Sequence, residues 1–294
     1  MDLKNFSNNK YILKDNIPRF VEGKNFAESF GIQWNQFRKV QLDSYTNSNI
    51  SEERVKTALQ VPLESIKGLK IIEAGSGAGR FTEVLLKYGA IVYSFDLSDA
   101  VSANYVNNMP NANLTIFQGD IEKIPFKNNF FDIALCLGVM QHTKNFTKSL
   151  EEIARVTKKS GVISFDHYQK HIGHYTSLYL IYWFLIKQFP KKLQLKTTNF
   201  LTSFFFPIHW MFRKYSFIQY LLRRVSPISF YYGMFDLNKK QHYELSKLDT
   251  HDKNTDYFKR MVTRNQLNVM VENFNFKKFI IFKGGTGLQC IITK

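Results

Sequence analysis

The stretch Leu-Lys-Ile-Ile-Glu-Ala-Gly-Ser-Gly-Ala-Gly-Arg-Phe, from Leu69 to Phe81, passes from apolar residues to alternating glycines. It predicts a buried strand over 69–74, a turn at Gly75, Gly77 and Gly79, and then the beginning of a helix. Glycine lets the backbone bend sharply and lets a ligand approach the main chain. The first turn of the helix adds free N–H groups. The stretch therefore predicts a nucleotide-type cofactor site at the carboxyl end of a parallel strand.

The glycine spacing and a neighbouring acid indicate which cofactor binds there. The dinucleotide fingerprint is G-x-G-x-x-G, whereas the glycines here follow G-x-G-x-G and Arg80 comes next. Glu73, at the end of the strand, would repel a pyrophosphate but suits a ligand that carries an ammonium and a sulfonium. S-adenosylmethionine is such a ligand. The string E-x-G-x-G-x-G resembles motif I of the class I S-adenosylmethionine-dependent methyltransferases.

Two more acids follow predicted strands in the order that this family shows. Asp96 ends a strand over 91–95 and is placed to accept hydrogen bonds from ribose hydroxyls. Asp120 follows a strand over 114–118, and the resemblance implies that it accepts from the adenine amino group while the Ile121 backbone meets the ring. Simple turn residues are the alternative for both acids. The predicted cofactor-binding residues are Glu73, Gly75, Gly77, Gly79, Asp96, Leu97, Asp120, Ile121 and Leu137.

Strand and helix patterns alternate from residue 69 to residue 168, which indicates a parallel sheet with helices on both faces. A helix over 51–60 is expected before the sheet, with Ser51 as its N-cap. Another helix is expected over 146–158 and ends at Gly161. The predicted fold class is therefore α/β and Rossmann-like.

The tail of the chain returns to the sheet pattern. Thr263 is expected to cap a helix, and a Gly-rich turn joins two strands over 278–282 and 288–293 into a hairpin. The sheet thus has seven strands, six parallel and the last antiparallel. The predicted units are an N-terminal helical cover (1–66), a methyltransferase core (67–168 and 237–294) and an inserted helical lid (169–236).

The predicted insert has an unusual composition. Between Asp166 and Asp236 lie 69 residues without any Asp or Glu, and they contain nine Lys or Arg and 20 aromatic residues. Two apolar runs, over 175–186 and 200–212, are shorter than the roughly 20 residues that cross a bilayer. Two readings remain open: a helical lid that packs on the sheet, or amphipathic helices that lie on an anionic membrane. Nucleic-acid binding ranks third, because these runs are too apolar for a solvated groove.

Two short stretches refine the resemblance. Phe30-Gly31-Ile32-Gln33-Trp34, followed by Gln41-Leu42-Asp43-Ser44, resembles the N-terminal lead of a bacterial methyltransferase group that is associated with glycan and cell-envelope biosynthesis. The resemblance implies that this lead folds over the cofactor end of the sheet. A packing helix is the alternative. The stretch Leu248–Asp252 resembles a segment of the same group, which is placed near the active-site mouth.

Composition sets further bounds. With 40 Lys and Arg against 24 Asp and Glu, the net charge is +16, which implies an anionic partner. Cys136 and Cys290 fall in predicted buried strands and suggest neither a disulfide nor a metal site. The first ten residues contain no hydrophobic signal core, so we expect a cytoplasmic protein, with peripheral contact at the inner face of the membrane if the insert binds lipid. The seven histidines show no metal-ligand spacing, and the sequence predicts no oligomeric state.

The expected reaction is methyl transfer, in which the protein mainly aligns the acceptor with the cofactor. A hydroxyl acceptor also needs a general base. His142 is the first candidate for this base, followed by His167 and Asp166 at the end of the fifth strand, although His142 could equally be a helix-start residue bonded to backbone.

The acceptor is expected to be small or lipid-linked, with the hydroxyl of a glycan or envelope precursor as the first choice. The alternatives are a lipophilic molecule of the quinone or fatty acyl type, and a protein that binds the cofactor without catalysis.

Overall fold

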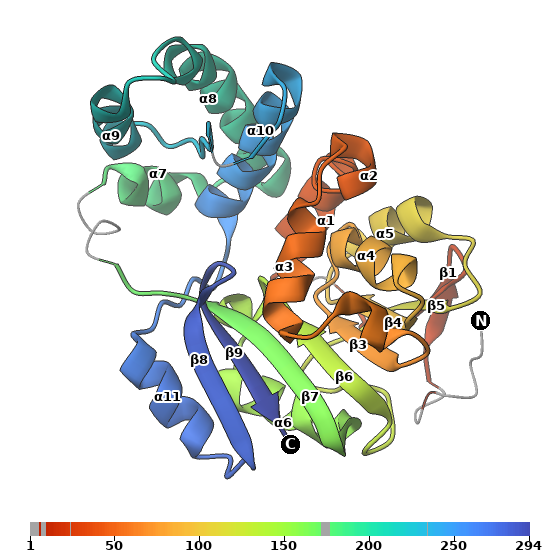
Figure 1. Cartoon of the computed structure of the whole chain (residues 1–294). Coiled ribbons are helices and arrows are strands. Elements are labelled where there is room, and N and C mark those ends of the chain that lie inside the picture. Colours follow the sequence, from red (N-terminus) through yellow and green to blue (C-terminus); the bar gives the residue numbers. More distant parts are fainter. Residues whose placement is uncertain (1–5, 7–9, 24, 172–176, 234) are drawn as a thin grey trace.

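A nine-stranded sheet forms the centre of the computed structural model, which describes residue 6 and residues 10–23, 25–171, 177–233 and 235–294. The strand order is β1-β2-β5-β4-β3-β6-β7-β9-β8 (Figure 1). The strands are β1 (Ile12–Lys14), β2 (Ile17–Arg19), β3 (Lys70–Ala74), β4 (Ile91–Asp96), β5 (Leu114–Gln118), β6 (Phe131–Cys136), β7 (Thr157–Tyr168), β8 (Lys278–Gly284) and β9 (Gly287–Thr293).

The strands β3 to β9 reproduce the predicted arrangement. β5, β4, β3, β6 and β7 pair in parallel, and β9 pairs antiparallel with both β7 and β8. β8 therefore runs in the same direction as β7, and only β9 opposes the others. The count of seven strands is too low for the whole sheet, because β2 pairs with β5 and β1 pairs with β2. The predicted cover is thus not only helical, since its first residues extend the sheet.

Helices cover both faces of this sheet (Figure 1). Side chains of α3, α4 and α5 pack on one face, and those of α6 and α11 pack on the other. The α-helices are α1 (Glu28–Gln36), α2 (Asp43–Thr46), α3 (Ile50–Leu59), α4 (Arg80–Lys87), α5 (Ala100–Asn108), α6 (Phe146–Val156), α7 (Tyr179–Ile186), α8 (Lys191–Met211), α9 (Ser216–Val225), α10 (Lys239–Thr255) and α11 (Arg264–Glu272). Short 3-10 helices are η2 (Leu63–Ile66) and η3 (Met140–His142).

Two predicted helix ends are wrong, each because a distant partner determines the end. Helix α3 begins at Ile50, and the Asp43 carboxylate accepts the N–H groups of Ser51 and Glu52 at 2.9 Å each. Ser51 is therefore not the cap. Helix α6 ends at Val156, and β7 begins at Thr157, which already pairs with β6. Gly161 therefore lies within a strand and does not end the helix.

The predicted cap of the last helix is confirmed. The Thr263 side chain accepts the backbone N–H of Gln266, and the Gln266 side chain accepts the backbone N–H of Thr263. This reciprocal pair satisfies two N–H groups that the helix itself leaves free.

The inserted segment stands above the sheet (Figure 1). Its described residues form α7, α8 and α9, while residues 172–176 and 234, and with them the beginning of the apolar run at 175, lie outside the described residues. Helix α10 follows the insert and packs on α8 and α7, although the sequence places it in the core. Within the described part of the chain, every helix is too short or too polar to cross a membrane.

A buried carboxylate joins three segments below the insert. The Asp166 side chain is fully buried at the end of β7. Its Oδ2 accepts hydrogen bonds from Arg54 Nη2 on α3 at 2.5 Å and from the Thr286 N–H in the β8–β9 turn at 3.2 Å. Its Oδ1 accepts the Gly138 N–H, after β6, at 2.5 Å. These partners offset the cost of placing a charge away from water.

We expect Asp166→Asn to lower the free energy of unfolding by about 3 kcal/mol, because the Arg54 guanidinium loses its charged partner in a mostly buried place. Urea denaturation of the purified protein measures the change. Lys56→Gln is the control, since Lys56 and Glu53 form an exposed pair with an N–O distance of 3.9 Å and such pairs contribute little. Equal stability of Asp166→Asn and the parent protein would contradict this role of the carboxylate.

Candidate active site

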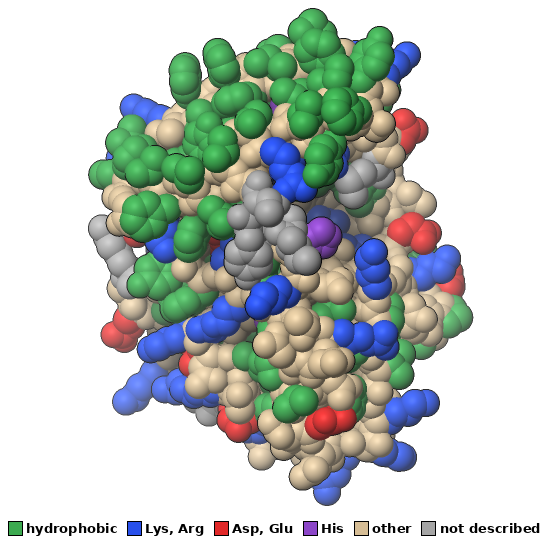
Figure 2. All heavy atoms as spheres, turned by 90° about the vertical axis from the view of Figure 1, so that its left-hand side faces the viewer, with side chains coloured by type: hydrophobic (Ala, Val, Ile, Leu, Met, Phe, Trp, Pro, Cys, Tyr) green, Lys and Arg blue, Asp and Glu red, His purple; other side chains and the backbone are tan. Residues whose placement is uncertain are grey.

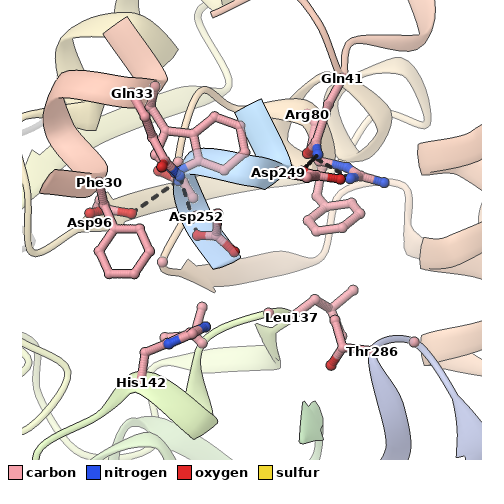
Figure 3. Close-up of a pocket in the computed structure, with 18 of the residues that line it drawn as sticks. Phe30, Gln33, Gln41, Arg80, Asp96, Leu137, His142, Asp249, Asp252 and Thr286 are labelled. Atoms are coloured by element: carbon pink, nitrogen blue, oxygen red, sulfur yellow. Dashed lines mark hydrogen bonds between the residues drawn. The ribbon is translucent and has the colours of Figure 1, made fainter. Parts of the chain in front are cut away.

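A cavity of about 870 Å³ lies at the carboxyl ends of the parallel strands. Segments that are far apart in sequence line it together. Its walls come from α1 and α3, from the turns after β3, β4, β5 and β6, from α10, and from the β8–β9 turn. Figure 3 shows side chains from these segments pointing toward one another across this space.

The glycine turn after β3 forms one wall. Gly75 and Gly77 line the cavity with φ of 71° and 53°, a backbone conformation that favours glycine. A Cβ on Gly75 would lie 2.2 Å from Val139 Cγ2, and one on Gly77 would lie 3.0 Å from the Trp34 ring. Gly79 does not line the cavity. A Cβ there would lie 2.2 Å from Asn104 Oδ1, so Gly79 allows α4 and α5 to pack.

Asp96 is positioned as the sequence predicts. Its Oδ2 accepts the Gly77 N–H at 3.0 Å, and its Oδ1 accepts the N–H and the hydroxyl of Ser98 at 2.8 and 2.7 Å. Burial raises the pKa of Asp96, and these hydrogen bonds oppose the rise. The carboxylate thus connects the glycine turn to the end of β4 and faces the same cavity.

Four other predicted residues also line the cavity: Leu97, Asp120, Ile121 and Leu137. Asp120 Oδ1 accepts the Glu122 N–H at 2.8 Å, which fixes the carboxylate at the end of β5. Ile121 and Leu137 are buried apolar side chains. The sequence thus identifies residues from three different strand ends that meet at one cavity.

Glu73 is oriented differently from the prediction. It is buried and does not line the cavity. Its Oε2 accepts the hydroxyls of Thr82 on α4 and Ser94 on β4. Burial raises the pKa of Glu73 to about 7. Side chains alternate between the faces of a strand, so Glu73 shares the face of Ile71 and points toward α4, away from the strand end.

Aromatic residues of α1 cover the glycine turn. Phe30 and Trp34 line the cavity, with Trp34 next to Gly77. The Phe30 ring meets the His142 ring edge-on, with centroids 5.4 Å apart. The stretch from Phe30 to Trp34 therefore covers the glycine turn at the carboxyl ends of the strands.

A polar cluster forms another part of the cavity. Arg80 Nη1 donates to Gln41 Oε1 at 2.7 Å, and burial beside Arg54 lowers the pKa of Arg80 to about 9. Burial and the neighbouring Asp252 raise the pKa of Asp249 to about 7. Both acids line the cavity, which agrees with the expected position of the Leu248–Asp252 stretch.

The sequence analysis does not identify Arg54, Arg80 or Tyr231 as residues of the site, although all three line the cavity. The sequence gives one hint that Arg80 has a special role, because a positive charge in the first turn of a helix is unfavourable. It gives no such hint for Arg54 and Tyr231, since they reach the cavity from α3 and from the segment after α9.

His142 is the one predicted catalytic residue that lines the cavity. Its Nδ1 lies 2.9 Å from the Phe258 carbonyl oxygen and 3.6 Å from Asp256 Oδ2. A carbonyl oxygen only accepts, so Nδ1 carries the proton and Nε2 of the neutral ring keeps a free lone pair. Burial raises the pKa of Asp256 to about 6, against the effect of Lys259 and His142.

The other two candidates do not reach the cavity. His167 is buried against Phe146, its Nδ1 lies 3.2 Å from the Tyr168 carbonyl oxygen, and burial lowers its pKa. The Asp166 carboxylate is occupied by its three donors. The alternation of β7 sends these two neighbours to opposite faces of the sheet, and neither faces the site. Among the described residues, His, Cys, Asp and Glu form no group of three that could hold a metal ion.

Comparisons with known proteins bear on this site. Residues 72–165 match the family described as a methyltransferase domain. Over these residues the chain is similar to a methyltransferase domain. The cavity fits S-adenosylmethionine, the cofactor that the sequence predicts, because glycines allow close approach while Asp96 and Asp120 offer acceptors at the ends of β4 and β5.

Two curated relatives and one solved structure illustrate the similarity. The chain is 26% identical over 148 residues to a malonyl-[acyl-carrier protein] O-methyltransferase of Buchnera aphidicola, covering 50% of this chain and 55% of that protein. It is 27% identical over 175 residues to a demethylmenaquinone methyltransferase of Tropheryma whipplei, covering 56% and 71%. A structure from Methanococcus maripaludis, assigned as an S-adenosyl-L-methionine-dependent methyltransferase, matches with a TM-score of 0.50 and 15% identity over 93% of this chain and 96% of that one. This last match shows the fold. The chain spans about half the length of the malonyl relative.

We expect Asp96→Ala to weaken S-adenosylmethionine binding by about 1–3 kcal/mol, because an acceptor for charged hydrogen bonds is lost and the Gly77 N–H loses its partner. Isothermal titration calorimetry measures the dissociation constant. Glu64→Ala, an exposed acid on η2, is the control. Unchanged affinity of Asp96→Ala would contradict the assignment.

We expect Glu73→Gln to change the pH dependence of stability. The folded protein holds a proton on Glu73 up to a pKa of about 7, whereas the usual value is 4.5. The carboxyl therefore costs stability as pH rises from about 4.5 to 7. Relative to the parent protein, the variant should gain up to about 3 kcal/mol in unfolding free energy between pH 4.5 and 8. Urea denaturation across this range measures the gain, and a constant difference would argue against a protonated Glu73.

Proposed function

We propose that the protein transfers a methyl group to an oxygen atom of an acceptor that is held in this cavity. The observation that carries the proposal is the meeting of two features at one cavity: a glycine turn with Asp96 and Asp120, and the His142 imidazole, whose Nδ1 is bound to the Phe258 carbonyl oxygen. When bound, S-adenosylmethionine supplies a methyl group that its sulfonium already activates. The protein must then bind, align and remove one proton.

Each residue has a distinct part in this proposal. Gly75 and Gly77 let the cofactor approach the backbone, and Asp96 and Asp120 accept its hydrogen bonds. The aromatic residues of α1 keep water from the reacting atoms. His142 Nε2 accepts the proton of a hydroxyl acceptor. The Phe258 carbonyl and the Asp256 carboxylate hold the ring and stabilise its protonated form.

The cavity suggests an amphipathic acceptor. Apolar side chains of Phe235, Leu237 and Leu245 line it together with the polar cluster around Arg80. Two acceptor classes are proposed on this basis. The first is a hydroxyl on a small or lipid-linked glycan or envelope precursor, supported by the sequence resemblance. The second is a quinone or fatty acyl molecule, supported by the names of the relatives.

A specific observation favours an acidic acceptor within the second class. Among the described residues, the Nε–H groups of Arg54 and Arg80 are buried and find no hydrogen-bond acceptor. Two guanidinium groups at one cavity suit a carboxylate. A carboxylate is already deprotonated and needs no base, so an acidic acceptor and a hydroxyl acceptor differ in their need for His142.

The acceptor can be identified with cofactor that carries a labelled methyl group. The protein is incubated with a lipid-linked sugar, a hydroxylated quinone precursor and a malonyl thioester, and labelled products are analysed by mass spectrometry. Cofactor binding is measured separately. Binding without product from any acceptor or from cell extract would favour a non-catalytic protein.

With a hydroxyl acceptor, we expect His142→Gln to lower kcat by at least about 100-fold, because the general base is lost. The dissociation constant for S-adenosylmethionine should stay close to that of the parent. The loss should shrink as pH rises, since the hydroxyl then ionises without help. Steady-state kinetics from pH 6 to 10 measure this, with exposed Lys127→Gln as control. Equal kcat of the variant and the parent at every pH would refute His142 as the general base.

A further inference from the structure

The inserted helices expose an unusual amount of apolar surface. We call it the apolar face. It gathers over one end of the molecule, as the hydrophobic side chains in Figure 2 show. Its members are Leu178, Ile181, Phe184 and Leu185 at α7, Leu193, Phe200, Phe204 and Met211 on α8, and Phe217, Tyr220, Leu221 and Val225 on α9. Large contiguous apolar patches are rare on the surface of soluble monomers and mark interaction sites.

Helix α8 exposes its apolar side and buries its polar side, which is the opposite of a typical helix in a globular protein. Leu193, Phe200, Phe204 and Met211 follow one another at intervals of seven, four and seven residues, which places them on one stripe of the helix. All four are exposed, and Phe200 keeps 69% of its surface accessible. The buried stripe of the same helix is mostly polar, with Gln194, Thr198, Thr202 and His209.

Two of these inward polar side chains form hydrogen bonds with residues outside α8. Thr198 Oγ1 lies 3.0 Å from His251 Nδ1 of α10. The two ring nitrogens of His209 lie 2.9 Å from Gln219 Oε1 and 2.8 Å from Ser226 Oγ. These hydrogen bonds, together with a small buried cluster of Phe206, Ile228 and Phe230, hold the inward side of α8, and the apolar stripe faces outward.

Helix α9 repeats this reversal. Phe217, Tyr220, Leu221 and Val225 are exposed on one side, while Gln219 is buried on the other. The exposed side chains of α7 continue the same face, as Figure 2 shows. Three helices thus present one apolar surface to the exterior.

The charges around the apolar face identify its partner. Residues 167–235 contain no acid, and exposed Lys192, Lys196, Lys214 and Arg223 accompany the apolar residues. A second copy docked through the same face would bring these like charges together with no acid from the segment to pair them. A lipid surface with anionic headgroups would pair them and also receive the apolar side chains.

We propose that the apolar face binds the surface of an anionic lipid bilayer. Helices α7, α8 and α9 lie in the headgroup boundary with Phe and Leu side chains directed to the acyl chains. The basic residues contact the phosphates. No methyl transfer is required for this binding, so it stands apart from the proposed reaction.

Vesicle flotation tests the proposal with the full chain. The parent protein should float with vesicles that mix phosphatidylglycerol and phosphatidylcholine at low salt. It should bind less at 0.5 M salt, because the screening length then falls to about 4 Å. It should also bind less to pure phosphatidylcholine. Replacing Lys192, Lys196, Lys214 and Arg223 by Gln should lower the partition coefficient by about fivefold for each charge lost.

Two matched variants separate the apolar face from general hydrophobicity. Phe184, Phe200, Phe204 and Phe217 changed together to Ser should abolish flotation. The control changes Val106, Val269 and Ile280 to Ser. These residues are also exposed but lie on α5, α11 and β8, and this variant should float like the parent. Thermal unfolding and cofactor binding confirm that each variant is folded.

Three results would overturn the proposal. The parent could ignore anionic vesicles at low salt, or the Phe-to-Ser variant could float as well as the parent. The third is a dimer, detected by analytical ultracentrifugation, that the Phe-to-Ser variant dissociates while the parent does not float. That result would make the apolar face an interface between two copies of this chain.

Discussion

The buried charge of Asp166 constrains the site more than any other interaction. Its three donors come from α3, from the turn after β6 and from the β8–β9 turn. Each of these donors, Arg54, Gly138 and Thr286, also lines the cavity. A carboxylate away from water must keep such partners. The lower part of the cavity is therefore held in one arrangement by the same contacts that make the burial of the charge tolerable.

Local rules explain the parts of the site that the sequence predicts. A Gly-rich turn and acids at strand ends follow from strand and helix patterns, and Gly75, Gly77, Asp96 and Asp120 all reach the cavity. The roles predicted for Glu73 and His167 assume that both side chains face the cavity. Side chains alternate between the two faces of a strand, and these two point elsewhere.

The features that the sequence did not predict depend on contacts between residues that are far apart in the chain. Arg54 pairs with a residue 112 positions away, and nothing near Arg54 in the sequence marks it as part of a cavity. The composition of the insert predicted basic and apolar helices but not which side of each faces outward. That depends on partners such as His251, which lies 53 residues from Thr198 and draws the polar stripe of α8 inward.

The contact between α1 and α10 sets the order in which the molecule can be completed. Ser29 and His251, whose Oγ and Nε2 lie 3.0 Å apart, are separated by 222 residues, and Gln33 and Asp252 by 219. Contacts of such separation form late, because a long loop must close before they bring any gain. During synthesis the glycine turn emerges long before α10. The cavity thus has no complete wall until residue 252 has been synthesised.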